Sequence, residues 1–333
     1  MNTQVLKRLA ALPIVAWVVI TIVFLVLRIV PGSAVDNLAR QATSEEQREQ
    51  IVEALGLNQS LWEQYLGFLG GVIRLDLGLS FYSGESVNSL LKEAMPVTIE
   101  LAVASLLVMV VVGVGPGMMA AAFRNTWIDA TARFIATVFF SMPWFWLGIL
   151  LIVIFGVWLG ALPTFGRLPP DVTYEPTTNF ILIDAVLQNR YDLILPWLAH
   201  LILPAVAVGL ATAGFVTRIT RASFIETMFD DFVRTARMKG MSEQRVFWRH
   251  IFRNAALPII TIIGLQFGAL LGGAVISEVV FSYPGVGRLM VGAIFQRDYP
   301  VVQGAALVIA LLSVIVNTLT DISYLYLDPR LRR

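Results

Sequence analysis

Long apolar stretches dominate this chain, and shorter segments between them hold most of the charged residues. A helix needs about 20 mostly apolar residues to cross the hydrocarbon core of a bilayer. The candidate spans are residues 9–30, 97–123, 134–162, 196–217, 257–281 and 301–327. The first is longer than the apolar part of a signal peptide, which is about 7–15 residues, so we interpret it as a retained span. The pattern predicts an all-α polytopic membrane protein with six transmembrane helices.

The composition supports this prediction and excludes several kinds of site. Hydrophobic residues make up 57% of the chain, charged residues make up 14%, and the mean hydropathy is +0.75. A soluble domain is about 45–50% apolar and about 25% charged. The absence of cysteine excludes disulfides and zinc–thiolate sites. No lysine follows a glycine, so the Gly-Lys of a P-loop is missing and any ATP must be bound by another chain.

The positive charges lie in alternate connections. Cytoplasmic loops of membrane proteins carry an excess of Lys and Arg. Segments 31–96 and 163–195 hold more acidic than basic residues, whereas both ends of the chain and segment 218–256 are basic. This alternation predicts that both termini and segment 218–256 are cytoplasmic.

The outer segment 31–96 has the pattern of a small helical unit. Thr43 and Ser44 followed by Glu45 and Glu46 form a typical helix start, with a hydroxyl cap and carboxylates in the first turn. An amphipathic pattern then continues through residues 61–69 to a Gly-Gly pair. The other outer segment, 163–195, is rich in proline and is expected to consist of turns.

The basic cytoplasmic segment predicts two short helices with a glycine elbow. Apolar residues recur every four positions over 220–239, which predicts one helix, and Gly240 ends it. Ser242 and Glu243 begin the next helix, and Pro258 is expected to open the fifth span. A basic loop of this kind could anchor to anionic lipids. Its apolar residues could instead fit a groove on a partner protein, and the pattern leaves both interpretations open.

This segment resembles a known motif. The run DFVRTARMKGMS (231–242), followed by RHIFRNAALP (249–258), closely resembles the cytoplasmic motif of ABC importer permeases of the dipeptide/oligopeptide/nickel family. In the wider superfamily the motif reads Glu-Ala-Ala, three residues, then Gly. Here Arg234, Thr235 and Ala236 replace Glu-Ala-Ala ahead of Gly240, a departure that is typical of the peptide branch.

The resemblance covers nearly the whole chain. Further matching runs are LRIVPGS (27–33), LGL (55–57), WEQYL (62–66), DLGLS (76–80), SMPWFWLG (141–148), EVVFSYPGVGR (278–288), RDYPVVQG (297–304) and DPR (328–330). The run FILID (180–184) is most similar to the first permease subunit of dipeptide systems. The resemblance implies a type I ABC importer transmembrane fold. It divides the chain into a first helix (1–30), an extracytoplasmic segment (31–96), a core (97–327) with coupling helices (221–256), and a tail (328–333).

The resemblance also implies partners and a mechanism. A second, homologous permease would complete the path, and two ATPases that bind ATP and Mg²⁺ would drive it. An extracytoplasmic binding protein would deliver di- or oligopeptides. The chain itself would be a non-catalytic, multi-pass subunit of a bacterial or archaeal plasma membrane, in contact with lipid and not with nucleic acid, and without a cofactor of its own. The implied ATPase-coupling residues are Phe232, Val233, Arg234, Thr235, Ala236, Arg237, Lys239 and Gly240.

Polar residues inside the spans are candidates for the translocation path, because polar groups in lipid are costly. These candidates are Gln266, Glu278, Asn317 and Asp321, with Glu278 expected near an outer gate. Hydrogen bonding between helices is the alternative role for Gln266 and Asn317, and Asp321 could pair with a basic residue.

Other functions fit the sequence less well. An ion-coupled secondary transporter would be expected to carry ionisable residues within its spans, and the middles of these spans are nearly free of charge. An intramembrane enzyme would need paired catalytic groups, and neither histidine lies in mid-span. Nickel-chelate, glutathione or another small solute remains an alternative cargo for the same architecture.

Overall fold

A computed structural model describes the backbone of residues 2–29 and 58–327, and the side chains of residues 13–29 and 58–320. Over these residues the chain is helical, with a single isolated bridge between Leu79 and Ser86. The helices are α1 (Asn2–Ile29), α4 (Leu61–Ile73), α5 (Val87–Ala122), α6 (Trp127–Ser141), α7 (Trp144–Leu151), α8 (Ile181–Leu187), α9 (Ile194–Met228), α10 (Asp231–Met238), α11 (Glu243–Val246), α12 (Arg253–Val280), α13 (Val286–Gln296) and α14 (Tyr299–Leu327). A 3₁₀ turn, Tyr191–Leu193, precedes α9, and π-helical turns, Ile152–Trp158 and Phe247–Phe252, follow α7 and precede α12.

The described residues contain four continuous helices that are long and apolar enough to cross a bilayer. They are Val87–Ala122, Tyr191–Met228, Glu243–Val280 and Tyr299–Thr320, and they correspond to four of the predicted spans. The part of α1 whose side chains the structure describes, Pro13–Ile29, is an apolar helix below the length used for these four. The prediction of six spans is therefore not confirmed as a count.

The stretch 134–162, predicted as one span, forms two helices. The chain bends by 105° between Trp127–Ser141 and Trp144–Trp158. Pro143 lies at this break, and Met142 before it is extended, with φ −86° and ψ 132°. The ring of a proline disfavours helical backbone in the residue that precedes it, which explains the bend.

Helix boundaries also differ from the prediction where polar residues continue a helix beyond its apolar part. Helix α5 begins at Val87 and α9 extends to Met228, each well outside its apolar stretch. Pro258 does not open a span as expected, because it lies inside α12, in a run that is helical from Glu243 onward. Polar ends of this kind project from the bilayer and need no apolar side chains.

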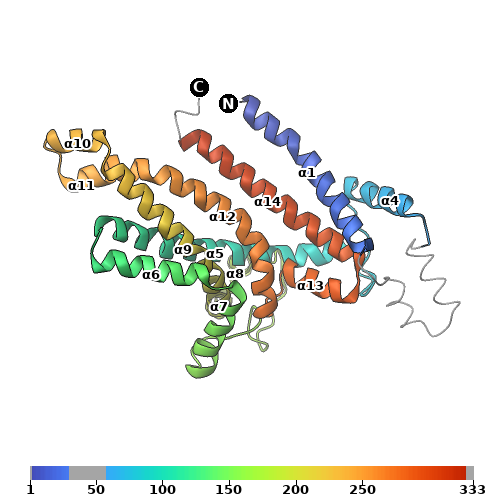
Figure 1. The fold of residues 1–333 in the computed structure, drawn as a ribbon. Helices are drawn as coiled ribbons and strands as arrows, with labels where there is room; N and C mark the ends of the chain where they lie inside the picture. Colours follow the sequence, from blue (N-terminus) through green and yellow to red (C-terminus); the bar gives the residue numbers. More distant parts are fainter. Residues whose placement is uncertain (1, 30–57, 328–333) are drawn as a thin grey trace.

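Helices α5 and α9 form the centre of the fold, and small residues allow their close approach. A Cβ on Gly117 would lie 2.6 Å from Cβ of Thr220, and one on Gly209 would lie 2.7 Å from Cβ of Val108. Helices α6, α7 and α12 pack around this pair, and α14 and α1 extend the bundle. Figure 1 shows α10 and α11 at one end of the long helices, and α4 and α13 near the opposite end.

The short helix α4 lies outside the main bundle and is attached to α1. A capping box begins it: Ser60 accepts a hydrogen bond from the backbone of Glu63, whose carboxylate accepts one from the backbone of Ser60. Tyr65 contacts α1 through a hydrogen bond of 2.8 Å with Thr21 and an edge contact with Phe24. The expected helix from residue 61 is therefore confirmed, whereas its expected start at 43–46 lies outside the described residues.

Adjacent glycines of α12 provide a test of how α7 is attached. The indole of Trp144 on α7 occupies the space that a Cβ of Gly273 would need, whereas a Cβ on Gly272 would meet nothing within 4 Å. We expect Gly273→Ala to lower the free energy of unfolding by about 1–3 kcal/mol, the usual cost of overpacking. Gly272→Ala is the matched control and should be neutral or slightly stabilising. Thermal unfolding of both purified variants checks this, and equal midpoints would contradict the packing described here.

Candidate functional site

The helix predicted over 220–239 is interrupted. Helix α9 ends at Met228, and Asp230 adopts an extended conformation (φ −63°, ψ 147°) before α10 begins. Its carbonyl accepts hydrogen bonds from the backbone of Val233 at 3.0 Å and of Arg234 at 3.2 Å. The side chain of Asp230 makes no capping hydrogen bond, so the break lies in its extended backbone. The prediction of one continuous helix was therefore wrong, and α10 is a separate helix.

The glycine elbow is confirmed. Gly240 has φ +72°, a backbone conformation that glycine adopts without the strain that a side chain brings. The backbone of Met241 donates to the carbonyl of Ala236 at 3.3 Å and closes the end of α10. Across the elbow, Nε of Arg237 lies 2.9 Å from a carboxylate oxygen of Glu243. The elbow therefore joins α10 to α11 in a fixed turn.

Only part of the predicted coupling surface faces outward. Val233 and Ala236 are buried within the chain, in a cluster with Phe224, Val246 and Ile251. They hold α10 against α9 and α11 and cannot contact a partner directly. The exposed members of the predicted set are Phe232, Arg234, Thr235, Arg237, Lys239 and Gly240. Met238, which was not in that set, is 74% exposed and lies on this surface.

A buried ion pair stabilises the end of the molecule that contains the glycine elbow. Asp129, at the start of α6, is fully buried. Arg221 of α9 donates two hydrogen bonds to its carboxylate, at 2.6 and 2.8 Å, and Arg133 lies at 3.2 Å. The backbone of Asn125 donates a further bond at 3.0 Å. This bidentate pair fixes α6 to α9 close to the point where α9 leads into α10.

The opposite end contains a buried charge network that the sequence did not indicate. Glu100 of α5 accepts hydrogen bonds from Arg167 at 2.6 Å, from the backbone of Ile181 at 2.7 Å and from the indole of Trp197 at 3.2 Å. Arg167 also donates to the carbonyl of Asn179 at 2.6 Å. The network therefore ties segment 163–181 to α5 and α9. The only signal in the sequence is a lone acidic residue in an apolar stretch, and its partner lies far away along the chain.

Asp184 of α8 holds the turn that leads into this network. Its buried carboxylate accepts hydrogen bonds from the backbones of Thr177, Thr178 and Asn179, at 3.2, 2.8 and 3.0 Å, and from the hydroxyl of Thr178 at 2.7 Å. Burial acts to raise the pKa of Asp184, but these hydrogen bonds outweigh it and leave the pKa below the ordinary value. Burial raises the pKa of nearby Tyr174 to about 12, so its phenol stays protonated.

Glu278, a candidate for the translocation path, has no exposed surface in this chain. Its carboxylate accepts hydrogen bonds from Thr98 of α5 at 2.6 Å and from the backbones of Gly287 and Arg288 at 2.7 and 3.1 Å. It therefore caps the N-terminus of α13, where a negative charge is favourable. Gly285 leaves room for it, because a Cβ there would lie 2.3 Å from the carboxylate carbon. Glu278 lies at the end where a gate was expected, and these hydrogen bonds link α5, α12 and α13 within this chain.

The other path candidates lie on α12 and α14. The side chain of Asn317 lies against Gly268 of α12, where a Cβ would come within 2.6 Å of its oxygen. This position favours a role for Asn317 in the contact between α14 and α12. Gln266 is half-buried on α12. The side chain of Asp321 lies outside the described residues.

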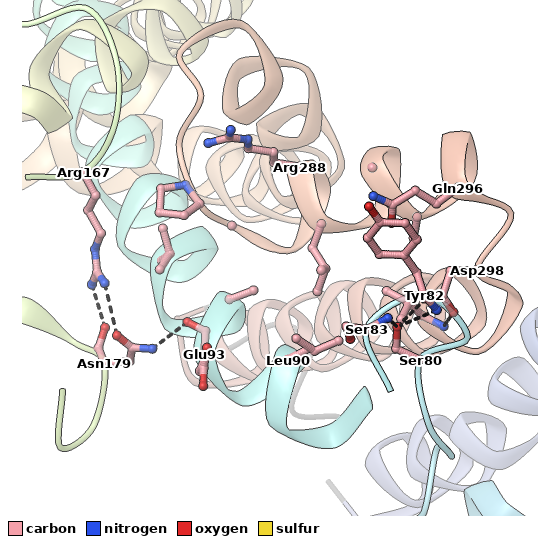
Figure 2. Close-up of a pocket in the computed structure, with 18 of the residues that line it drawn as sticks. Ser80, Tyr82, Ser83, Leu90, Glu93, Arg167, Asn179, Arg288, Gln296 and Asp298 are labelled. Carbon is pink, nitrogen blue, oxygen red and sulfur yellow. Dashed lines mark hydrogen bonds between the residues drawn. The ribbon is translucent and has the colours of Figure 1, made fainter. Parts of the chain in front are cut away.

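An open pocket lies at the same end as Glu100 and Glu278. It has a volume of about 700 Å³ and lies between the start of α5, helix α13, and the loops around Tyr82 and Asn179. Figure 2 shows Arg167, Asn179 and Glu93 on one side, and Tyr82, Ser83 and Asp298 on another. Among the described residues, no cluster of three or more His, Asp or Glu side chains could hold a metal ion.

Comparison with known proteins identifies the family. Residues 113–333 match the family described as the binding-protein-dependent transport system inner membrane component. Residues 1–102 match the N-terminal part of the same class of membrane component. The chain belongs to this family of importer permeases.

Curated relatives match this permease over its full length. The di/tripeptide transport system permease protein of Pseudomonas aeruginosa is 37% identical over 100% of this chain and 99% of that protein. The dipeptide transport system permease protein of Escherichia coli is 38% identical over 99% of this chain and 98% of that protein.

Solved structures support the fold of the permease. An inward-facing methionine ABC transporter gives a TM-score of 0.55 at 14% identity, over 72% of this chain and 96% of that one. An amino acid ABC transporter gives 0.51 at 15% identity, over 71% and 93%. The chain therefore has the fold of type I ABC importer permeases, as the sequence predicted.

The network around Glu100 predicts a large effect of removing its countercharge. Arg167→Met leaves a carboxylate buried and unpaired, which should lower the free energy of unfolding by about 3–5 kcal/mol. The double variant Glu100→Gln/Arg167→Met should recover most of that loss. Arg190→Gln, which breaks an exposed ion pair with Asp192, is the control and should change the unfolding midpoint little. Equal unfolding midpoints for Arg167→Met and Arg190→Gln would contradict a stabilising role of the Glu100–Arg167 pair.

The lowered pKa of Asp184 predicts an acid-sensitive turn. The carboxylate form is the bonded form, so its stabilisation is complete above the unfolded pKa of about 3.9 and is lost as pH falls through the lower folded pKa. Hydrogen exchange of the amides of residues 177–179 should therefore be protected at neutral pH and should lose protection in Asp184→Asn. Asp192→Asn is the exposed control. Unchanged protection in Asp184→Asn would refute this anchoring.

Proposed function

We propose that this permease is one of two membrane-spanning subunits of an ATP-driven importer of di- and oligopeptides. In this proposal it is a non-catalytic subunit that shares one translocation path with a second, homologous permease. Two ATPases bind ATP and Mg²⁺ on the cytoplasmic side, and an external binding protein delivers the peptide. Both termini of the chain are cytoplasmic.

The observation that carries the proposal is the arrangement of α10. The inner face of this helix is buried through Val233 and Ala236, and its outer face presents Phe232, Thr235 and Met238 without any cover from the described residues. A short helix that is rigidly supported on one side and exposed on the other fits a groove on a partner protein. A lipid anchor would not require the support of a buried cluster.

The charge distribution supports the orientation. Segment 218–256, which contains the elbow, is the most basic connection of the chain, whereas segments 31–96 and 163–195 have more acidic than basic residues. Basic connections favour the cytoplasmic side of a membrane. The ATPases would therefore contact α10 and α11, whereas the binding protein would meet the end that contains α4 and α13.

The contacts at the elbow support a coupling mechanism. The ion pair of Arg237 with Glu243 and the aromatic contacts of Phe224 with Phe247 and Phe252 join the elbow to α9 and α12. Movement of the elbow by an ATPase would therefore be transmitted to two spans at once. Such movement can shift the permease between inward- and outward-facing states only if the ATPases bind those states with different affinity.

The cargo is proposed from the named relatives, which are dipeptide and di/tripeptide permeases aligned over their whole length. A transport assay with the purified complex and its binding protein decides between peptides and other small solutes.

The natural absence of cysteine allows a direct test of the elbow. Met238→Cys, on the exposed face of α10, should form a cross-link with an ATPase subunit in native membranes when a short bis-maleimide is added. Tyr82→Cys is the matched control, because Tyr82 is 58% exposed at the opposite end. It should give no ATPase adduct.

Intact-complex mass spectrometry then counts the partners. The proposal requires one further permease and two ATPases for each copy of this chain. If Met238→Cys gives no ATPase adduct, or if the chain is recovered as a homo-oligomer, the importer subunit proposal fails.

A further inference from the structure

The outer pocket has an apolar floor and charged walls. Val97 and Ala94 of α5, and Ala293 and Val301 from α13 and α14, form part of its lining and are almost completely buried. Its volume of about 700 Å³ falls within the range of about 300–1,000 Å³ that is common for small-molecule sites. The pocket can therefore enclose a small organic molecule.

The guanidinium of Arg288 provides a positive charge in this pocket. Arg288 is exposed in the first turns of α13, and its Nη1 donates to the carbonyl of Ser282, which orients the side chain. No carboxylate of the described residues forms an ion pair with it. A guanidinium has five N–H donors, so most of them remain available in a fixed direction. This arrangement suits a carboxylate, which guanidinium groups bind in a bidentate manner.

Glu93 provides a negative charge in the same pocket as Arg288. It is exposed on α5, and the side-chain amide of Asn179 donates to its backbone carbonyl at 2.9 Å, which fixes the adjoining loop. Its own carboxylate has no partner among the described residues. Arg288 and Glu93 come from different helices and line the same pocket (Figure 2).

The remaining charges in the lining are already neutralised or bonded. Arg167 is paired with Glu100 outside the pocket. Asp298 is buried and accepts hydrogen bonds from the hydroxyl of Ser80 and from the backbones of Phe81 and Tyr82. Among the described residues of the lining, Arg288 is a cation and Glu93 an anion without an ion-pair partner, and apolar side chains line the same pocket. A molecule with a charge of each sign at its two ends complements this pattern.

We propose that this pocket binds a short peptide as a zwitterion, with Arg288 contacting the peptide carboxylate and Glu93 contacting the terminal ammonium. The inference rests on the proposed peptide import and adds a binding site on the outer side of this subunit. The apolar floor would take the small apolar parts of the peptide, and exposed Tyr82 would flank them.

The test is binding of alanyl-alanine to the assembled importer in lipid nanodiscs, without the binding protein. The matched probes are its C-terminal amide, its N-acetyl form and free alanine. In the wild type, either block should weaken binding by about tenfold, the effect of losing one charge-assisted hydrogen bond. Free alanine, which lacks the second residue of the peptide, should bind more weakly.

The variants assign each charge to its residue. Arg288→Gln should bind alanyl-alanine and its C-terminal amide equally well. It should still bind the N-acetyl form more weakly than alanyl-alanine. Glu93→Gln should show the reverse pattern. Lys92→Gln, a neighbouring exposed position that does not line the pocket, is the control and should behave as wild type.

The outcomes separate this inference from the proposed function. The pocket is not a peptide site if the wild type shows no detectable binding of alanyl-alanine. The same conclusion follows if Arg288→Gln and Glu93→Gln discriminate among the probes as the wild type does. ATP-driven uptake of alanyl-alanine by the same complex, with its binding protein added, would leave the importer function standing in either case. Lack of uptake by the wild type would instead refute the proposed function.

Discussion

A carboxylate removed from water must be surrounded by hydrogen-bond donors, and this requirement organises the connections of the permease. Glu100 accepts hydrogen bonds from Arg167, Ile181 and Trp197, and so holds segment 163–181 on α5 and α9. Glu278 gathers backbone donors at the start of α13. These two carboxylates therefore attach segment 163–181 and the start of α13 to the long helices.

The same rule applies at both ends of the bundle. Asp129 joins α6 to α9 at the end that contains the elbow, and Asp298 joins residues 80–82 to the start of α14 at the opposite end. The middle of the bundle relies instead on close packing, as between Gly117 and Thr220. This division places polar anchors where segments must be held and apolar contacts where helices lie in the membrane.

The two ends differ in what they leave uncovered. At the elbow, the buried faces of Val233 and Ala236 support an exposed surface on α10, a geometry that suits contact with another protein. At the opposite end, the pocket retains the uncommitted charges of Arg288 and Glu93. An importer subunit needs contact with partner proteins and access for a solute, and the two ends present different surfaces.

The amino-acid sequence by itself determined the helical membrane class, four of the spans, the glycine elbow and the family, because apolar length, Gly240 and the motif around it are local signals. It misplaced the elements that depend on single residues in context, such as the break at Asp230 and the bend at Pro143. Only the tertiary structure decided that Val233 and Ala236 face inward, that Glu278 caps α13, and that Glu100 is paired with Arg167. These facts concern partners distant along the chain or the direction of a side chain in three dimensions, and no local pattern of apolar and polar residues records either.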